Sequence, residues 1–170
     1  IWQRNVPVDV GSLLHDDLEN LRISIPSHRL ERPLREALHE CGFQNNSTGE
    51  GLIKDVVMLC HSFYELTRSP SIEIRLEVVT GNSCWKFHSD YVEMRLITTY
   101  LGRGTQWIND RNLSYMANDV DPEAINELCA GDVGLFKGRL AKGRPAIHRS
   151  PPIDGSGEKR LLLVLNPVTE

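Results

Sequence analysis

Three residues in the second half of the chain have the types and spacing of a metal site. His88 and Asp90 form an H-x-D pair, and His148 follows much further along the chain. Residues i and i+2 of a strand point to the same side, so His88 and Asp90 can hold one ion together. Two imidazoles and one carboxylate on one face of an ion leave the opposite positions open. This facial ligand set suits Fe(II) chemistry in which oxygen and a cosubstrate must both reach the metal.

Arg160 is a further candidate because it is a charged residue in an apolar strand. It opens the run RLLLVL at 160–165, whose two faces are both apolar. A guanidinium on such a strand is costly to bury unless a carboxylate meets it. Glu158 or Asp154, in the loop before the strand, can supply that carboxylate. A bound dicarboxylate gripped by the guanidinium fork is the alternative.

Residues beside these candidates are open to two interpretations. Cys84 lies just before the H-x-D pair and is either a small buried residue or a thiolate near the metal. The second reading would make a Cys/His/Asp zinc site. Trp85 and Trp107 are either core residues or part of a substrate pocket. Ser150 has no base at a recognisable spacing, so we do not expect a serine nucleophile.

The elements that must position these residues change type near Pro70. Before it, the pattern predicts a short helix that Ser12 caps and that reaches Leu21, and a second helix from Pro33 to Gly42. A third helix has the clearest apolar stripe, which consists of Leu52, Val56, Leu59, Phe63 and Leu66.

After Pro70 the alternation of apolar and polar residues predicts short strands separated by turns. We expect strands at 72–78, 84–88, 92–101, 105–108, 133–136, 146–148 and 160–165. A brief helix should begin at Asp121-Pro122, and Arg95 should pair with Glu77 or Glu93 across the sheet. Such a series of strands indicates a sandwich or barrel.

Composition and charge limit the classes of partner. The chain has 170 residues, a net charge of −4 and a pI of about 5.9, without a cluster of Lys and Arg that would bind phosphates, so nucleic acid is not expected. No apolar run is long enough to cross a bilayer, and no secretory signal opens the sequence. Four scattered cysteines without a C-x-x-C pair indicate reduced thiols, and we expect a cytoplasmic protein with a small-molecule or peptide substrate.

The candidate residues and their surroundings resemble the Fe(II)/2-oxoglutarate-dependent dioxygenases over roughly 72–166. The H-x-D pair, a distal histidine and a basic residue about a dozen positions further are shared features. Residues 95–101 with 104–105 are similar to the strand and turn after H-x-D in prolyl hydroxylases, and 130–136 to the strand before the distal histidine. The stretch from His148 to Arg160 is similar to the end of the alkylation-repair dioxygenases.

This resemblance implies a fold that is α+β and mainly β. It is a double-stranded β-helix, a jelly-roll or cupin-like barrel, over 71–170, with a helical layer over 1–70, and together they form a single domain over 1–170. His88, Asp90 and His148 would hold Fe(II), and 2-oxoglutarate would chelate the metal with its distal carboxylate on Arg160.

One residue departs from the dioxygenase pattern. Many dioxygenases carry R-x-S at the cosubstrate arginine, whereas Leu162 stands at the third position here. The resemblance therefore implies that Tyr100 or Thr98 supplies the missing hydroxyl.

A closer resemblance, to a bacterial domain family with no assigned function, covers nearly the whole chain. It rests on the stretches CWKFHSDYVEMRLITTYLGRGTQWI and LFKGRLAKGRPAIHRSPPIDGSGEKRLLLVL. It supplies no substrate, so two alternatives to an oxygenase stay open. One is a cupin-like protein that binds zinc or another divalent metal through the same residues, with or without Cys84. The other is an interaction module with a vestigial site.

Overall fold

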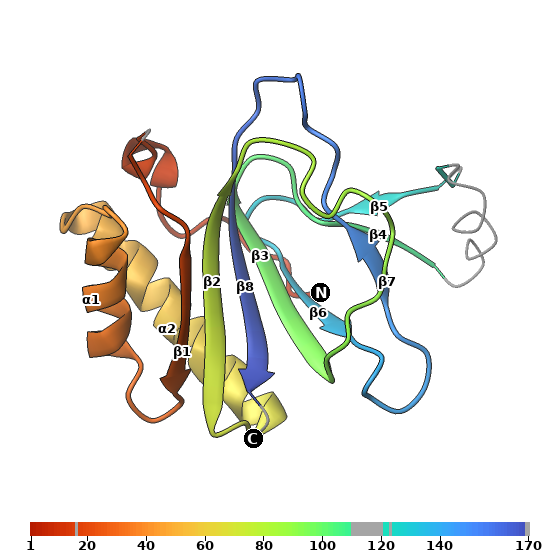
Figure 1. Ribbon diagram of the computed structural model, residues 1–170, viewed down its shortest axis with the longest axis horizontal. Coiled ribbons are helices and arrows are strands. Elements are labelled where there is room, and N and C mark those ends of the chain that lie inside the picture. The colour runs from red at the N-terminus through yellow and green to blue at the C-terminus, as the bar shows by residue number, and fades with distance from the viewer. Residues whose placement is uncertain (16, 110–120, 123, 169–170) are drawn as a thin grey trace.

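The computed structural model describes residues 1–15, 17–109, 121–122 and 124–168 (Figure 1). Its helical elements are the 3-10 helix η1 (Val10–Leu13), α1 (Glu31–Glu40) and α2 (Ser47–Thr67). Its strands are β1 (Leu21–Pro26), β2 (Ser71–Val79), β3 (Met94–Leu101), β4 (Gln106–Ile108), β5 (Asn126–Glu127), β6 (Val133–Lys137), β7 (Ile147–Arg149) and β8 (Arg160–Val168). None of the helices in the described part combines the length and the apolar character needed to span a bilayer.

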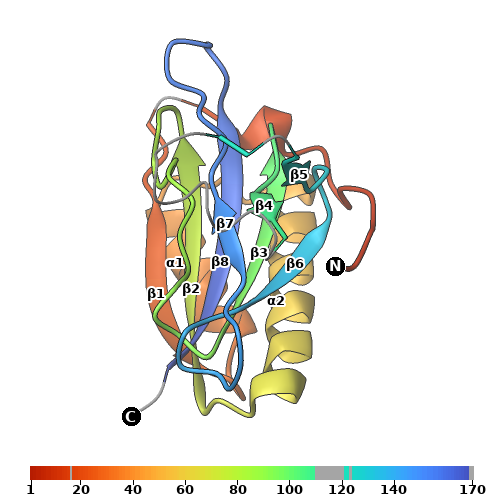
Figure 2. The ribbon, with the colours of Figure 1, turned by 90° about the vertical axis from the view of Figure 1, so that its right-hand side faces the viewer.

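The strands form two antiparallel sheets. The larger sheet has the order β1-β2-β8-β3-β6, and the smaller has the order β5-β4-β7. Helices α1 and α2 lie against one face of the larger sheet, and the smaller sheet lies over the other face (Figures 1 and 2). The mainly β part of the expected fold is thus present as two antiparallel sheets that face each other, and within the described residues their strand ladders do not join into one closed barrel.

The face of the larger sheet toward the helices carries the main apolar core. Strand alternation directs every second residue of β2 and β8 to this side. The core joins Ile72, Ile74 and Leu76 of β2, Leu161, Leu163 and Leu165 of β8, and Leu52, Val56, Leu59 and Phe63 of α2. The predicted stripe on α2 is thus buried, except that Leu66 is 57% exposed.

Four sequence predictions of local structure are wrong. Residues 21–26 form β1 instead of ending a helix, because Leu21, Ile23 and Ile25 alternate with polar residues and pair with β2. The first helix is a single 3-10 turn capped by Asp9, not by Ser12. Residues 84–87 form turns instead of a strand, and the described residues at Asp121-Pro122 form no helix.

The structure also corrects the expected roles of Tyr100 and Thr98. Both side chains lie on the helix side of β3, whereas Arg95 and Thr99 of the same strand point to the other side. The Tyr100 hydroxyl donates to Asp55 Oδ2 at 2.6 Å within the helix-side core, and the Thr98 hydroxyl donates to the Gly131 carbonyl at 3.4 Å. Neither hydroxyl faces Arg160, so neither can complete a cosubstrate site there.

Replacing Tyr100 with phenylalanine should therefore lower stability without affecting a metal site. The change removes a buried hydrogen bond to the carboxylate of Asp55, which costs about 1.5–3 kcal/mol. Chemical denaturation should show this loss, while titration with Co(II) should give the wild-type affinity. The half-buried Tyr64 on α2 provides a matched control, and Tyr64→Phe should leave both quantities close to wild type. A Tyr100→Phe protein with normal stability and impaired metal binding would contradict the correction.

Candidate metal centre

A backbone bridge brings the two ends of the predicted triad together. The His88 amide donates to the His148 carbonyl, and the His148 amide donates to the His88 carbonyl, each at 2.9 Å. The loop after β2 is thereby fixed to β7 of the smaller sheet. Asp90 follows two residues later, and its carbonyl accepts from the Arg139 amide at 2.9 Å. A side chain at Gly138 would collide with the Val92 carbonyl. Glycine at this position therefore allows the backbone after β6 to lie close to the loop that carries Asp90.

His88, Asp90 and His148 converge on one point. One potential ligand atom from each residue lies within 4.8 Å of the other two. Asp90 Oδ2 is 3.1 Å from His148 Nε2, and Asp90 Oδ1 is 3.6 Å from His88 Nε2. The side chain of His148 is 3% exposed and that of Asp90 9%, whereas that of His88 is 33% exposed. The group is therefore open to solvent on the His88 side alone.

Two hydrogen-bonding features test whether these side chains fit a metal. His88 Nδ1 lies 2.8 Å from the Lys86 carbonyl. If Nδ1–H donates there, Nε2 carries the free lone pair that a metal needs. Asp90 Oδ2 is buried without a hydrogen-bond partner among the described residues, which is the condition of a carboxylate oxygen that binds a cation. His148 Nδ1 also lacks a partner there, and the Phe136 ring packs at 4.5 Å from the His148 ring.

The charges of the site favour an ionised carboxylate. Burial opposes ionisation of Asp90, but the adjacent His148 and His88 rings and the Arg95 guanidinium outweigh it and hold the pKa of this carboxyl well below its usual range. Interaction with Asp90 raises the pKa of His88, although burial opposes this. A metal ion must therefore compete with a proton on His88, but not with one on Asp90 at neutral pH.

Arg95 is a site residue that sequence reasoning missed. Its Nη1 donates to Asp90 Oδ1 at 2.6 Å, and its Nε donates to Asn166 Oδ1 at 2.7 Å. The expected pairing with Glu77 or Glu93 is wrong, because Glu77 pairs with Arg75 and the Arg95 guanidinium reaches Asp90 instead. The sequence indicates this role only through the position of Arg95, a charged residue on the same face of β3 as Ile97 and Thr99.

Arg160 is fully buried, and its hydrogen bonds go to neutral groups. Its Nε donates to the Arg103 carbonyl at 2.6 Å, its Nη1 to the Ser150 hydroxyl at 2.9 Å, and its Nη2 to Thr99 Oγ1 at 3.4 Å. None of the ion pairs between described residues includes Arg160, so the two loop carboxylates expected from the sequence are not its partners. Burial lowers the pKa of Arg160 to about 10, which still leaves it protonated at neutral pH.

A small cavity beside the triad connects it to the surroundings of Arg160. His88 and His148 line it at one place, and Ser150, the hydrogen-bond partner of Arg160, lines it at another. Its volume is about 60 Å³. Cys84 also lines this cavity, with a φ of 50°, but it lies outside the group of ligand atoms formed by the triad. A Cys/His/Asp site is therefore not what the structure assembles.

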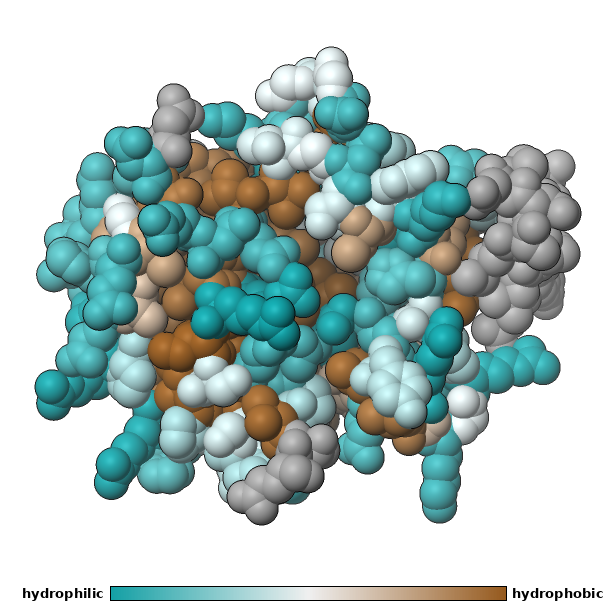
Figure 3. Space-filling view, viewed as in Figure 1, coloured by the Kyte–Doolittle hydropathy of each residue, from teal (hydrophilic) through white to brown (hydrophobic). Residues whose placement is uncertain are grey.

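A larger groove adjoins this cavity on the open part of the larger sheet. It has a volume of about 450 Å³ and shares Arg75 and Arg95 with the triad cavity. Tyr91 and Leu140, which are 77% and 50% exposed, line it too. Hydrophilic side chains gather over the middle of β2 and β8, between apolar ones, in the space-filling view (Figure 3).

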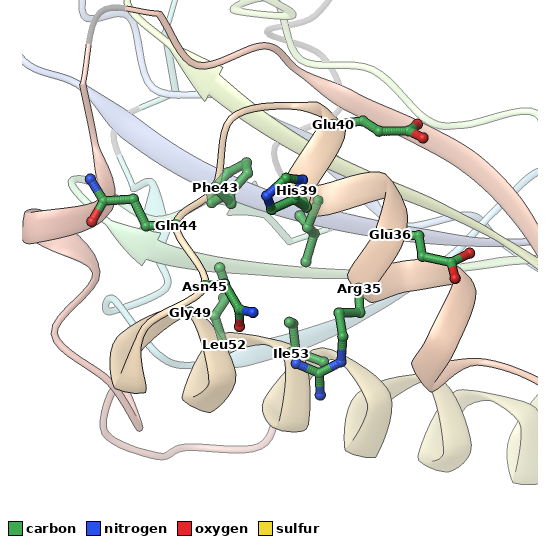
Figure 4. Close-up of a pocket in the computed structure, with 11 residues that line it drawn as sticks. Arg35, Glu36, His39, Glu40, Phe43, Gln44, Asn45, Gly49, Leu52 and Ile53 are labelled. Carbon is green, nitrogen blue, oxygen red and sulfur yellow. The ribbon is translucent and has the colours of Figure 1, made fainter.

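Another cavity, of about 310 Å³, lies on the helix side between α1 and the start of α2 (Figure 4). Its floor includes Phe43 and Leu52, and His39 and Arg35 lie at its border. Arg35 is paired with Glu50 of α2. Among the described residues, the one group of side chains with metal-binding geometry is the triad on the other side of the sheet, so we take the triad as the candidate functional site.

Comparisons with known proteins support the fold. A family model described as "Protein of unknown function (DUF1826)" matches residues 1–166. No curated protein matches the chain. Among solved structures, it is similar to dioxygenase for auxin oxidation 1 from Arabidopsis thaliana, in a binary complex with 2-oxoglutarate. The TM-score is 0.59 and the identity is 8%, over 89% of this chain and 62% of that one.

Two further similar structures have lower TM-scores. A Pseudomonas putida prolyl-4-hydroxylase gives a TM-score of 0.41 at 10% identity, over 89% of this chain and 88% of that one. Hydroxypropylphosphonic acid epoxidase from S. wedmorenis gives 0.38 at 17% identity, over 58% and 44%. The similarity to the auxin dioxygenase, with its TM-score of 0.59, confirms the resemblance to the Fe(II)/2-oxoglutarate dioxygenases for the fold. The chain spans about 62% of the length of the auxin dioxygenase.

Proposed function

The chain belongs to the DUF1826 family, and we propose from its site that it is a non-haem Fe(II)- and 2-oxoglutarate-dependent oxygenase. The observation that carries this proposal is the convergence of His88, Asp90 and His148 on one point. The fold similarity to a dioxygenase described with bound 2-oxoglutarate adds support. We propose that the substrate is a small molecule or a peptide.

The three side chains would hold the metal through Nε2 of the two histidines and Oδ2 of Asp90. Bound Fe(II) would supply the oxygen chemistry, and three protein ligands would leave room for oxygen and a cosubstrate. The residues of the chain orient these ligands: the backbone bridge positions His88 against His148, and the Lys86 carbonyl orients the His88 ring.

Arg160 would bind the distal carboxylate of 2-oxoglutarate, with Ser150 and Thr99 as neighbouring hydroxyl groups. This replaces the sequence-based assignment of Tyr100 and Thr98. The physical reason is that this buried guanidinium forms no ion pair with a carboxylate among the described residues, so an entering anion would offset the cost of its burial. Ligand pockets usually measure about 300–1,000 Å³, so the lining of the 60 Å³ cavity has to move when the cosubstrate enters.

The adjoining groove would hold the substrate. Its volume of about 450 Å³ is within the usual range for ligand sites. It shares Arg75 and Arg95 with the triad cavity, so a molecule in the groove would lie close to the metal ligands.

The proposal is tested with protein purified without oxygen and loaded with Fe(II). We expect one Fe(II) per chain, binding of 2-oxoglutarate by calorimetry, and slow formation of succinate when oxygen is admitted without a substrate. A wild-type protein that binds Fe(II) but not 2-oxoglutarate would remove the cosubstrate from the assignment.

A second candidate function is that of a non-oxygenase protein that binds zinc or another divalent metal. One observation favours it: the nitrogen atoms of Arg160 already have protein acceptors in the Arg103 carbonyl, Ser150 and Thr99. Arg160 would then be a structural residue. Metal analysis after anaerobic purification separates the two candidates, because the second predicts zinc in place of iron and no response to 2-oxoglutarate.

A further inference from the structure

We propose that Arg95 is a positioning residue that fixes the Asp90 carboxylate so that Oδ2 is the oxygen presented to the metal. The inference rests on the metal site proposed above. Arg95 Nη1 donates to Asp90 Oδ1 at 2.6 Å. The other oxygen, Oδ2, is buried without a hydrogen-bond partner among the described residues and lies 3.1 Å from His148 Nε2. One oxygen is therefore held and the other is left for a cation.

Arg95 can hold the carboxylate because a row of polar side chains fixes Arg95 in turn. Its Nε donates to Asn166 Oδ1 at 2.7 Å, and Asn166 Nδ2 donates to Glu73 Oε1 at 2.8 Å. Glu73 Oε2 accepts from Arg22 Nη2 at 2.8 Å. These residues stand on β3, β8, β2 and β1, which are neighbours in that order in the sheet. The row thus crosses the sheet from its exposed edge to the metal-binding carboxylate.

The backbone register makes this row rigid. Glu73 and Asn166 are directly paired residues of β2 and β8, and the Asn166 side chain is buried with its residue 7% exposed. Arg95 has a side chain that is 17% exposed, so its guanidinium has little freedom to leave Asp90. Residues that orient a metal ligand typically change metal affinity by about 10- to 100-fold when they are replaced.

The charge of Arg95 and its orienting of Asp90 should have opposite effects on metal affinity. The direction in which the affinity changes when Arg95 is replaced therefore tests the proposal. A cation beside Asp90 repels a divalent metal and draws charge from the ligand oxygen. If Arg95 acted through its charge alone, its removal would tighten metal binding. If it acts by orienting the carboxylate, its removal weakens metal binding in spite of the relieved repulsion.

The experiment titrates metal-free protein with Co(II) and follows both calorimetry and the visible absorption of the bound ion. Arg95→Met should weaken Co(II) binding by about 10- to 100-fold and shift the absorption bands, because the carboxylate is no longer held in one orientation. Arg95→Lys keeps the charge but cannot make both hydrogen bonds, so it should also bind more weakly than wild type. Asn166→Ala changes no charge and should give a smaller loss of the same sign.

Arg35→Met is the matched control. Arg35 is an ion-paired arginine of similar partial burial, with a side chain 33% exposed, in helix α1 away from the site. Its replacement should leave the affinity and spectrum unchanged. Should Arg95→Met fail to fold by circular dichroism, Arg95→Lys and Asn166→Ala decide the question.

The outcomes separate this inference from the proposed function. If wild type binds Co(II), His148→Ala does not, and the Arg95 and Asn166 variants bind as tightly as wild type or more tightly, the positioning role is overturned and the metal site stands. If wild type binds no Co(II), the proposed metal site and the role of Arg95 are both overturned. Weaker binding and a shifted spectrum in the variants, but not in the control, support the proposal.

Discussion

Replacing His148 with alanine is expected to weaken Fe(II) or Co(II) binding by about 100- to 1,000-fold and to abolish oxygenase activity. Zinc sites with four ligands bind with about 10–16 kcal/mol, so one ligand contributes roughly 3–4 kcal/mol, which corresponds to this factor. His148 is the most buried member of the triad, with a side chain 3% exposed. A water molecule could replace its imidazole only by occupying a space enclosed by Phe136 and His88.

Calorimetry with Co(II) in the absence of oxygen measures this loss directly. His39→Ala is the control, because His39 lies at the helix-side cavity on the other side of the sheet (Figure 4). A thermal melt adds a second readout: Co(II) should raise the melting temperature of wild type and His39→Ala, since a ligand that binds only the folded state stabilises it. It should leave that of His148→Ala nearly unchanged. Wild-type affinity in His148→Ala would show that the metal binds elsewhere.

The triad could be predicted from the sequence because its geometry is mostly local. His88 and Asp90 are separated by one residue, so their side chains fall on one side whichever strand they follow. His148 needed only a second strand to bring it near. The structure adds the backbone bridge between His88 and His148, which no pattern of residue types indicates. The expected strand at 84–88 is not needed, since this bridge and the hydrogen bond from the Arg139 amide to the Asp90 carbonyl hold the loop.

The residues around the triad could not be predicted, because they depend on strand register. The sequence resemblance predicts Tyr100 or Thr98 as the hydroxyl donor, but even-numbered and odd-numbered residues of β3 face opposite sides of the sheet. Only the pairing of Thr99 with Leu162 shows that Thr99 belongs to the side of Arg160. The contact of Arg95 with Asp90 likewise requires the position of the loop relative to β3.

The edge strand β1 cannot be predicted from the sequence for a related reason. Its first residue, Leu21, also fits a helical stripe with Leu14 and Leu18 of the preceding segment. A strand of this length is stabilised by pairing, here Ile23 with Ile74 and Ile25 with Ile72, and not by its own propensity. The local pattern alone could not decide between the two structures.

Replacing Arg160 with methionine is expected to abolish detectable 2-oxoglutarate binding while metal affinity stays at the wild-type level. A carboxylate held by two charge-assisted hydrogen bonds loses about 3 kcal/mol or more without them, which is a factor of more than about 100. Arg160 is protonated at neutral pH, since its pKa is lowered only to about 10. Its hydrogen bonds go to the Arg103 carbonyl, Ser150 and Thr99 and not to His88, Asp90 or His148, so we expect the metal ligands to stay in place.

The Arg160 experiment distinguishes a cosubstrate role from a structural one. Anaerobic calorimetry of Fe(II)-loaded protein measures 2-oxoglutarate affinity, and denaturation measures stability. A purely structural Arg160 predicts a stability loss of about 1–3 kcal/mol from the unpaired Arg103 carbonyl and the two hydroxyls, with no change in 2-oxoglutarate response. Arg160→Lys keeps the charge but loses the fork, so it should bind 2-oxoglutarate weakly. Arg103→Met controls for the loss of a nearby guanidinium, because the Arg103 side chain pairs with Glu127. If Arg160→Met binds 2-oxoglutarate like wild type, the cosubstrate lies elsewhere in the cavity, and Arg160 serves to hold Ser150 and Thr99 in place.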